Sequence, residues 1–213
     1  MDTLLNAYSQ ERVEFIRGWW GMYFKEIEEN VNAGKFPFHK SERDSGEFLF
    51  YLNASRSVGE IVLELACGAG RMSIALGHAG IRVIGLDASL PMLSYGHKIL
   101  SLFPEDVQKR VRFVQGDMCN FALRKPVRLI IIPFNSFWYN FYRMGGSPRT
   151  HADSCVRCII DALEFEGRFI VDAPNHNNCG YWWYEMAEKY GFRFVISDDK
   201  YFHTVLIGEK TSR

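Results

Sequence analysis

Three acidic residues in this chain follow short apolar segments, and a glycine turn comes directly after the first. Glu64 stands near the end of the first segment, with Gly68 and Gly70 just beyond it, and Asp87 and Asp117 end the next two. Glycine lets the backbone turn sharply and approach a ligand, because no β-carbon stands in the way. A carboxylate about twenty residues after such a turn typically accepts hydrogen bonds from ribose hydroxyls. The spacing therefore predicts a site for a ribose-containing ligand.

The same residues belong to three motifs, which are Glu64-Leu-Ala-Cys-Gly-Ala-Gly70, Ile81-Arg-Val-Ile-Gly-Leu-Asp87 and Val111-Arg-Phe-Val-Gln-Gly-Asp-Met118. Together they resemble the class I S-adenosylmethionine-dependent methyltransferases. The resemblance implies S-adenosylmethionine as cofactor and S-adenosylhomocysteine as product. It places Glu64 at the methionine end, Asp87 at the ribose and Asp117 at the adenine. The implied cofactor-binding residues are Glu64, Ala66, Cys67, Gly68, Gly70, Arg71, Asp87, Ala88, Met92, Gly116, Asp117, Met118, Pro133 and Phe134.

A nicotinamide dinucleotide is the competing ligand, since a glycine turn with a later acid serves both. Ser73 stands where the dinucleotide fingerprint has its third glycine. A carboxylate at Glu64 would also repel a pyrophosphate. The motifs therefore favour S-adenosylmethionine.

The remaining sequence alternates strands and helices. This order predicts an α/β fold, and the resemblance specifies a seven-stranded, mostly parallel Rossmann-like sheet with helices on both faces and an N-terminal helical lid. The last two strands are expected to form an antiparallel pair. The expected strands are 61–66, 82–87, 111–115, 127–134, 168–172, 192–196 and 201–208, and the expected helices are 70–79, 90–102, 150–164 and 180–190, with a further one near 48–52.

The end of the fourth strand is the usual active-site position of the resembled family. The segment Ile132-Pro-Phe-Asn-Ser-Phe137 resembles small, free-standing methyltransferases of natural products and metabolites, and it lacks the Asn-Pro-Pro-aromatic motif of amino-directed DNA methyltransferases. Asn135 and Ser136 can each donate and accept hydrogen bonds there. If the acceptor must lose a proton, His176 is the preferred base by position, with His39, His151 and His203 as alternatives.

Two aromatic groups are candidates for substrate contact. Trp138, Tyr139 and Tyr142 follow the fourth strand and could wall an aromatic or apolar substrate or face a cation. Trp19, Trp20 and Tyr23 lie on an amphipathic helix that could cover the site, pack on the sheet or join two subunits as a homodimer. We therefore divide the chain into a helical lid, 1–45, and a methyltransferase domain, 46–213, with residues 40–44 as a mobile connection. Tyr181, Trp182, Trp183 and Tyr184 are expected to pack in the core.

Length, net charge and cysteine content narrow the range of functions and ligands that the sequence allows. The 213 residues fit one α/β core, and 25 basic residues balance 25 acidic ones, so nothing indicates nucleic-acid binding. No apolar run is long enough to span a membrane, and five irregularly spaced cysteines suit the reducing cytoplasm. His151, Cys155 and Cys158 could share a helix face and bind a metal, but their spacing favours a buried stripe, and we expect no metal.

The sequence therefore predicts methyl transfer from S-adenosylmethionine to a nitrogen or oxygen of a small molecule. One alternative is a fold member that binds the cofactor without methylating, as a cyclase or a binding subunit. Another is a protein-directed methyltransferase, which would need an open acceptor groove.

Overall fold

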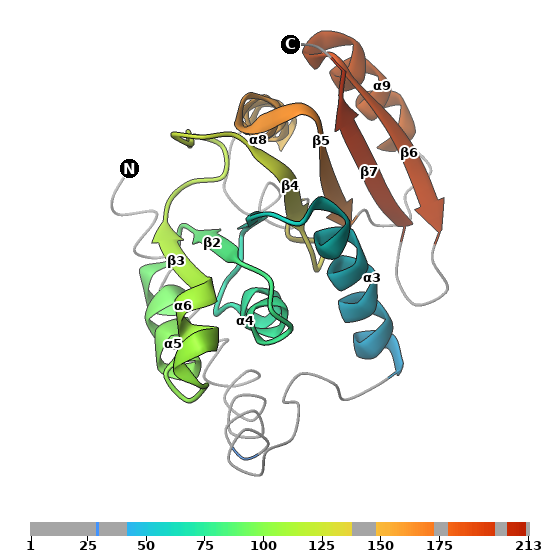
Figure 1. Cartoon of the computed structure of the whole chain (residues 1–213). Helices are drawn as coiled ribbons and strands as arrows, with labels where there is room; N and C mark the ends of the chain where they lie inside the picture. The colour runs from blue at the N-terminus through green and yellow to red at the C-terminus, as the bar shows by residue number, and fades with distance from the viewer. Residues whose placement is uncertain (1–28, 30–41, 138–147, 173–178, 199–203, 212–213) are drawn as a thin grey trace.

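The computed structural model describes residues 29, 42–137, 148–172, 179–198 and 204–211, and these form a layered α/β structure around one sheet (Figure 1). The sheet has seven strands in the order β3-β2-β1-β4-β5-β7-β6. All neighbours are parallel except β7, which runs antiparallel to β5 and β6. The strands are β1 Val62–Leu65, β2 Val83–Asp87, β3 Val111–Gln115, β4 Val127–Ile132, β5 Leu163–Asp172, β6 Phe192–Asp198 and β7 Thr204–Lys210. The predicted fold class and the antiparallel close of the sheet are confirmed.

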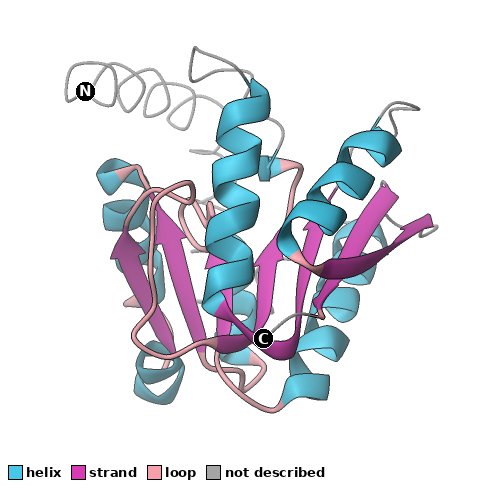
Figure 2. Cartoon of the chain, turned by 90° about the horizontal axis from the view of Figure 1, so that it is seen from above, coloured by secondary structure: helices cyan, strands magenta, loops and turns pink. Residues whose placement is uncertain are grey.

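Helices cover both faces of the sheet (Figure 2). The helices are α3 Glu42–Val58, α4 Arg71–His78, α5 Leu90–Leu100, α6 Glu105–Arg110, α8 Pro148–Ala162 and α9 Cys179–Tyr190. On one face, side chains of α3, α4, α5 and α6 join two buried clusters with the sheet. On the other face, α8 and α9 pack in a third cluster.

The central strand β4 shows why the sheet must be covered twice. Its sequence is almost continuously apolar, as expected of a parallel strand with two buried faces. Leu129 and Ile131 belong to the cluster under α3, whereas Ile130 and Ile132 belong to the cluster under α8 and α9. The alternation of a strand thus sends neighbouring residues into opposite layers.

Several local predictions are corrected by the structure. Residues 42–44, expected in a mobile connection, are the first residues of α3. The helix α6 was not predicted, and β5 begins at Leu163, five residues early, with a register shift against β4 and a left-handed Glu166 (φ 61°). Tyr184 is 68% exposed rather than part of the core.

Other predictions of core packing are confirmed. Trp183 is fully buried and stacks on Phe137, with ring centroids 5.4 Å apart. Cys155 and Cys158 are buried in the cluster under α8, as the helical stripe predicted.

Within the described part of the chain no group of three or more His, Cys, Asp or Glu side chains could hold a metal ion. No described helix is long and apolar enough to cross a membrane.

Candidate active site

The predicted site residues meet at one edge of the sheet. Strands β1 to β5 are mutually parallel, so their carboxyl ends lie along the same edge. Glu64, Asp87 and Asp117 come from the ends of β1, β2 and β3, and Pro133 follows β4. In open α/β sheets this edge, where the strand order reverses beside β1, is where ligands bind. A fourth acid, Asp172, ends β5 at the same edge and was not predicted as a site residue.

Asp87 holds the glycine turn against the end of β2. One carboxylate oxygen accepts a hydrogen bond from the Gly68 amide and the other from the Ser89 amide, both at 2.8 Å. The side chain is only 3% exposed. Each oxygen keeps a second acceptor position, so the predicted bond to a ribose hydroxyl is compatible with this arrangement. Beside it, the buried hydroxyl of Ser89 has no hydrogen-bond partner among the described residues.

The glycines of the turn are required for a reason that the sequence did not reveal. Gly70 has a φ of 80°, and a β-carbon there would lie 2.2 Å from the Phe113 ring. Gly68 has a φ of 58°, and a β-carbon would lie 3.0 Å from the methyl group of Met92. At these positions the missing β-carbon therefore permits the left-handed backbone and close packing inside the protein.

Glu64 is a buried acid next to this turn. Ser73, which occupies the place of the dinucleotide fingerprint's third glycine, donates a hydrogen bond from its hydroxyl to Glu64. Burial raises the pKa of Glu64 to about 7, partly offset by the hydrogen bond from Ser73 and the charge of Arg71. A positively charged ligand group would therefore stabilise the ionised form of this carboxylate.

The end of β3 presents its acid to solvent. Asp117 is exposed, and one of its carboxylate oxygens accepts a hydrogen bond from the Cys119 amide at 2.8 Å. Met118, which the resemblance places beside the adenine ring, is buried in the cluster under α8 and α9. The Gly116 amide donates to the carbonyl of Asp87 at 3.1 Å, which ties the ends of β2 and β3 together.

The remaining predicted cofactor residues line the same turns. Cys67 is buried, and burial raises the pKa of its thiol well above the usual value. Ala66 is half-buried with a φ of 55°, and Ala88 is half-buried after β2. These positions are consistent with the prediction but do not by themselves establish contact with a ligand.

The end of β4 is joined to Asp172. The Phe134 amide donates to Asp172 at 2.5 Å, and the Tyr51 hydroxyl of α3 donates to its other oxygen. Phe134 and Asn135 are both non-glycine residues with positive φ, 66° and 55°. Such conformations cost about 1–3 kcal/mol each and tend to persist where surrounding contacts enforce them, often at functional sites. Burial raises the pKa of Asp172 to about 6.

Arg71 links this region to α3. Its guanidinium forms an ion pair with Glu47 at 2.6 Å and lies 4.9 Å from the centroid of the exposed Phe134 ring. The other carboxylate oxygen of Glu47 and the side-chain oxygen of Asn135 are buried without a hydrogen-bond partner among the described residues. Glu47, Tyr51 and Asp172 escaped the sequence analysis, although Asp172 ends a predicted strand as the other three acids do.

Part of the predicted site lies outside the described residues. Asn135, one of the two predicted catalytic residues, lies just after β4, whereas His176, the other, is outside the described residues. Ser136, a predicted substrate-binding residue, is half-buried in the turn after β4. The predicted substrate-binding residues outside it are Trp19, Trp20, Tyr23, Trp138, Tyr139 and Tyr142.

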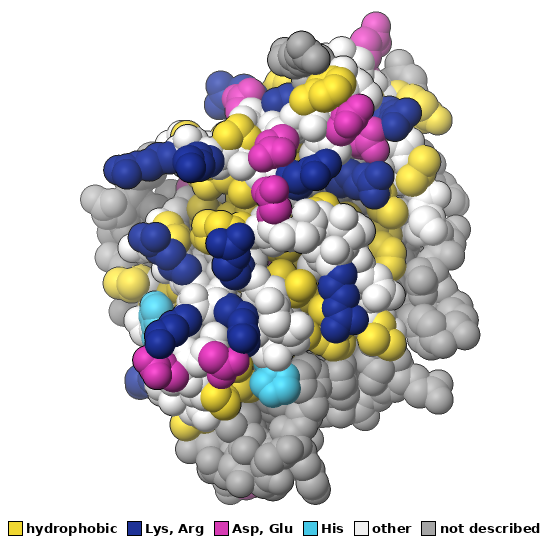
Figure 3. Space-filling view, viewed as in Figure 1, with side chains coloured by type: hydrophobic (Ala, Val, Ile, Leu, Met, Phe, Trp, Pro, Cys, Tyr) yellow, Lys and Arg dark blue, Asp and Glu magenta, His cyan; other side chains and the backbone are white. Residues whose placement is uncertain are grey.

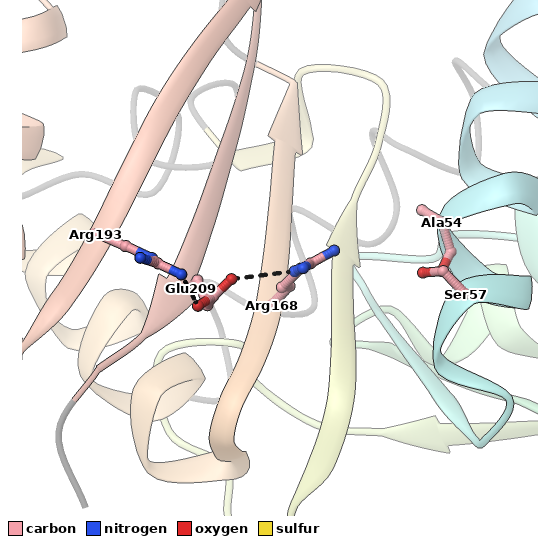
Figure 4. Close-up of polar contacts among 5 residues, drawn as sticks. All are labelled: Ala54, Ser57, Arg168, Arg193 and Glu209. Atoms are coloured by element: carbon pink, nitrogen blue, oxygen red, sulfur yellow. Dashed lines mark hydrogen bonds and ion pairs between the residues drawn. The ribbon is translucent and has the colours of Figure 1, made fainter.

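A hollow of about 500 Å³ lies at the other edge of the sheet, near the residues where β4, β5 and β6 begin. It is lined by Ser57, Val58, Arg128, Glu166, Arg168, Arg193 and Glu209. Glu209 pairs with both Arg193 and Arg168, at 2.6 and 3.3 Å (Figure 4). The pKa of Glu209 is lowered, first by its hydrogen bond to Arg193. Basic side chains on this side are spread over several elements rather than gathered in one strip (Figure 3). The hollow has none of the strand-end acids.

The sheet order and the acids at the strand ends agree with the Rossmann-like fold that the sequence motifs led us to expect. Residues 62–143 match the family model described as a methyltransferase domain. A segment of 80 residues is 32% identical to the cypemycin N-terminal methyltransferase of a Streptomyces species, covering 38% of this chain and 30% of that protein. Residues 62–143, which match the family model, hold the glycine turn and all three predicted cofactor acids.

Solved structures show the same fold over most of the chain. The glycopeptide N-methyltransferase MtfA has a TM-score of 0.66 at 19% identity, covering 78% of this chain and 95% of its own. CalS10 of Micromonospora echinaspora, an amino pentose methyltransferase, has a TM-score of 0.62 at 12% identity, covering 81% and 92%. MtfA has been solved with S-adenosylmethionine and with S-adenosylhomocysteine, and CalS10 with S-adenosylmethionine. Residues 62–143 thus match a methyltransferase domain, and the solved methyltransferase structures share the fold of most of the chain.

Proposed function

We propose that this protein transfers the methyl group of S-adenosylmethionine to a nitrogen or oxygen of a small metabolite or natural product. The observation that carries the proposal is the convergence of Glu64, Asp87 and Asp117 on one sheet edge, beside a turn held in place by Asp87. The similar proteins are named as an N-terminal methyltransferase, a glycopeptide N-methyltransferase and an amino pentose methyltransferase, and these names support an acceptor of this kind.

The residues at this edge fit the cofactor. Asp87 has free acceptor positions for ribose hydroxyls, Asp117 faces solvent where the adenine would lie, and the orphaned Ser89 hydroxyl can bond to a ligand. Glu64 gains stability as an anion when a cationic group lies near it. The cofactor supplies a methyl group already activated on a sulfonium, so the chain needs chiefly to align the acceptor and exclude water. The aromatic residues Trp138, Tyr139 and Tyr142, with Trp19, Trp20 and Tyr23, are proposed to form the wall and lid of the acceptor pocket.

Calorimetry with S-adenosylmethionine, S-adenosylhomocysteine and a nicotinamide dinucleotide tests the cofactor. We expect micromolar binding of the first two and none of the third. Binding of the dinucleotide alone would overturn the proposal. A screen of amines and phenols for release of S-adenosylhomocysteine then tests the reaction, and cofactor binding without turnover on any acceptor would favour the non-methylating alternative.

A further inference from the structure

Two buried hydrogen-bond acceptors lie where α3 meets the ends of β4 and β5. Glu47 and Asn135 each have a buried side-chain oxygen without a partner among the described residues. Buried polar atoms in folded proteins are nearly always hydrogen-bonded, so two orphans at one edge indicate a missing partner. A carboxylate oxygen accepts hydrogen bonds and has no hydrogen to donate, so the group that bonds to the free Glu47 oxygen must be a donor.

Contacts on both sides link these two residues to Asp172. Asn135 follows Phe134, whose amide donates to Asp172 at 2.5 Å. Glu47 pairs with Arg71 at 2.6 Å, and Arg71 lies over the Phe134 ring. The backbone at Phe134 and Asn135 is left-handed, and Asp172 is close enough to Glu47 for the charge of Glu47 to raise the pKa of Asp172.

Among the described residues, the buried charged side chains are acids, and three of them, Glu47, Glu64 and Asp172, lie in this region. The charge of Arg71 partly opposes the rise in the pKa of Glu64 and of Asp172. Burying a carboxylate without a paired cation is costly, and a charged ligand that supplies the cation removes this cost. The pKa of Asp172, raised to about 6 by burial, has the same cause.

From this geometry we propose that the methyl acceptor is an amine, bound as its ammonium ion by Asp172, with Glu47 and Asn135 as further hydrogen-bond acceptors. This inference rests on the proposed function and names the substrate class for that site. An ammonium has donors for all three side chains and adds a positive charge beside Asp172. Asp172 can then take the proton that the ammonium must lose before its nitrogen has a free lone pair: R–NH3⁺ and the carboxylate become R–NH2 and the carboxylic acid. A neutral phenol would bring no positive charge to Asp172.

The test needs no knowledge of the natural acceptor. Sinefungin carries an amine in place of the transferred methyl group, whereas S-adenosylhomocysteine carries nothing there, so the ratio of their affinities reports a cation beside the acceptor site. We expect the full-length wild-type protein at pH 8 to bind sinefungin about 10-fold or more tightly than S-adenosylhomocysteine in calorimetry, as a charge-assisted hydrogen bond allows. In Asp172→Asn the ratio should fall toward one, while S-adenosylhomocysteine affinity changes less than about 3-fold.

Glu47→Gln provides a second variant that keeps the shape of the side chain, and it should lower the ratio as well. Asp161→Asn, an exposed change on α8, is the matched control and should leave the ratio at the wild-type value. If Asp172→Asn does not fold, because it loses part of the Tyr51 contact, Glu47→Gln decides the matter alone.

The outcomes separate the two proposals. Tight binding of both ligands with the same ratio in wild type and variants would overturn the amine inference and leave the proposed function standing. Failure of the wild type to bind S-adenosylhomocysteine would overturn the proposed function and the inference with it.

Discussion

Asp87→Asn is the substitution that best separates the structural role of a strand-end acid from its role in binding. In the structure, the two carboxylate oxygens accept hydrogen bonds from the amides of Gly68 and Ser89, each at 2.8 Å. Asparagine offers only one acceptor oxygen, so its NH2 group must face the second amide. The variant therefore loses one charge-assisted bond, weakens the other and leaves a buried donor unpaired.

The expected cost follows from these contacts. Hydrogen bonds to a charged group contribute about 1.5–3 kcal/mol, and an unsatisfied buried donor costs about 1–3 kcal/mol. Because the terms overlap at one side chain, we expect the free energy of unfolding to fall by about 2–4 kcal/mol. This is a large share of a typical total of about 5–15 kcal/mol, but it leaves a folded protein to measure.

Urea unfolding followed by tryptophan fluorescence measures the loss, with an unchanged slope showing that the change is one of stability. Calorimetry on the folded variant should show S-adenosylhomocysteine affinity lowered about 10-fold or more, because the turn shifts and a ribose acceptor is lost. Asp117→Asn is the matched control: its side chain is exposed, and we expect less than about 1 kcal/mol of destabilisation. An Asp87→Asn protein within about 0.5 kcal/mol of wild type would refute the role of Asp87 in holding the turn.

Two further predictions follow from the same edge. Burial raises the pKa of Glu64 from 4.5 to about 7, so the folded state binds the proton more tightly, and stability should fall as pH rises through this window, by on the order of 3 kcal/mol. Glu64→Gln should remove that decline in urea unfolding between pH 5 and 8, and an unchanged pH profile would contradict it. Gly70→Ala should destabilise by about 2–5 kcal/mol, because alanine is strained at a φ of 80° and its methyl group meets Phe113. The double variant Gly70→Ala with Phe113→Leu should recover part of this loss, and no recovery would show that the contact is not the cause.

The sequence by itself determined the class of fold and the position of three acids at one edge of the sheet. Apolar runs that end in Glu64, Asp87 and Asp117 can be read locally, because strand length, burial and the glycine turn are set by neighbouring residues. The continuous apolar run of β4 likewise predicted a central strand before any contact was known. The boundaries were less exact at β5, where the register shift beside Val127 depends on pairing between strands.

Only the tertiary structure decided what those residues touch. Nothing local indicates that Gly70 must be glycine because of Phe113, or that Ser73 bonds to Glu64, since these partners come from different elements. The cluster of Glu47, Tyr51 and Asp172 forms only when α3 packs over the ends of β4 and β5 and brings together residues up to 125 positions apart in the chain. Their burial, and with it the raised pKa of Tyr51 and of Asp172, is a property of that packing, because desolvation depends on every element that closes over a side chain.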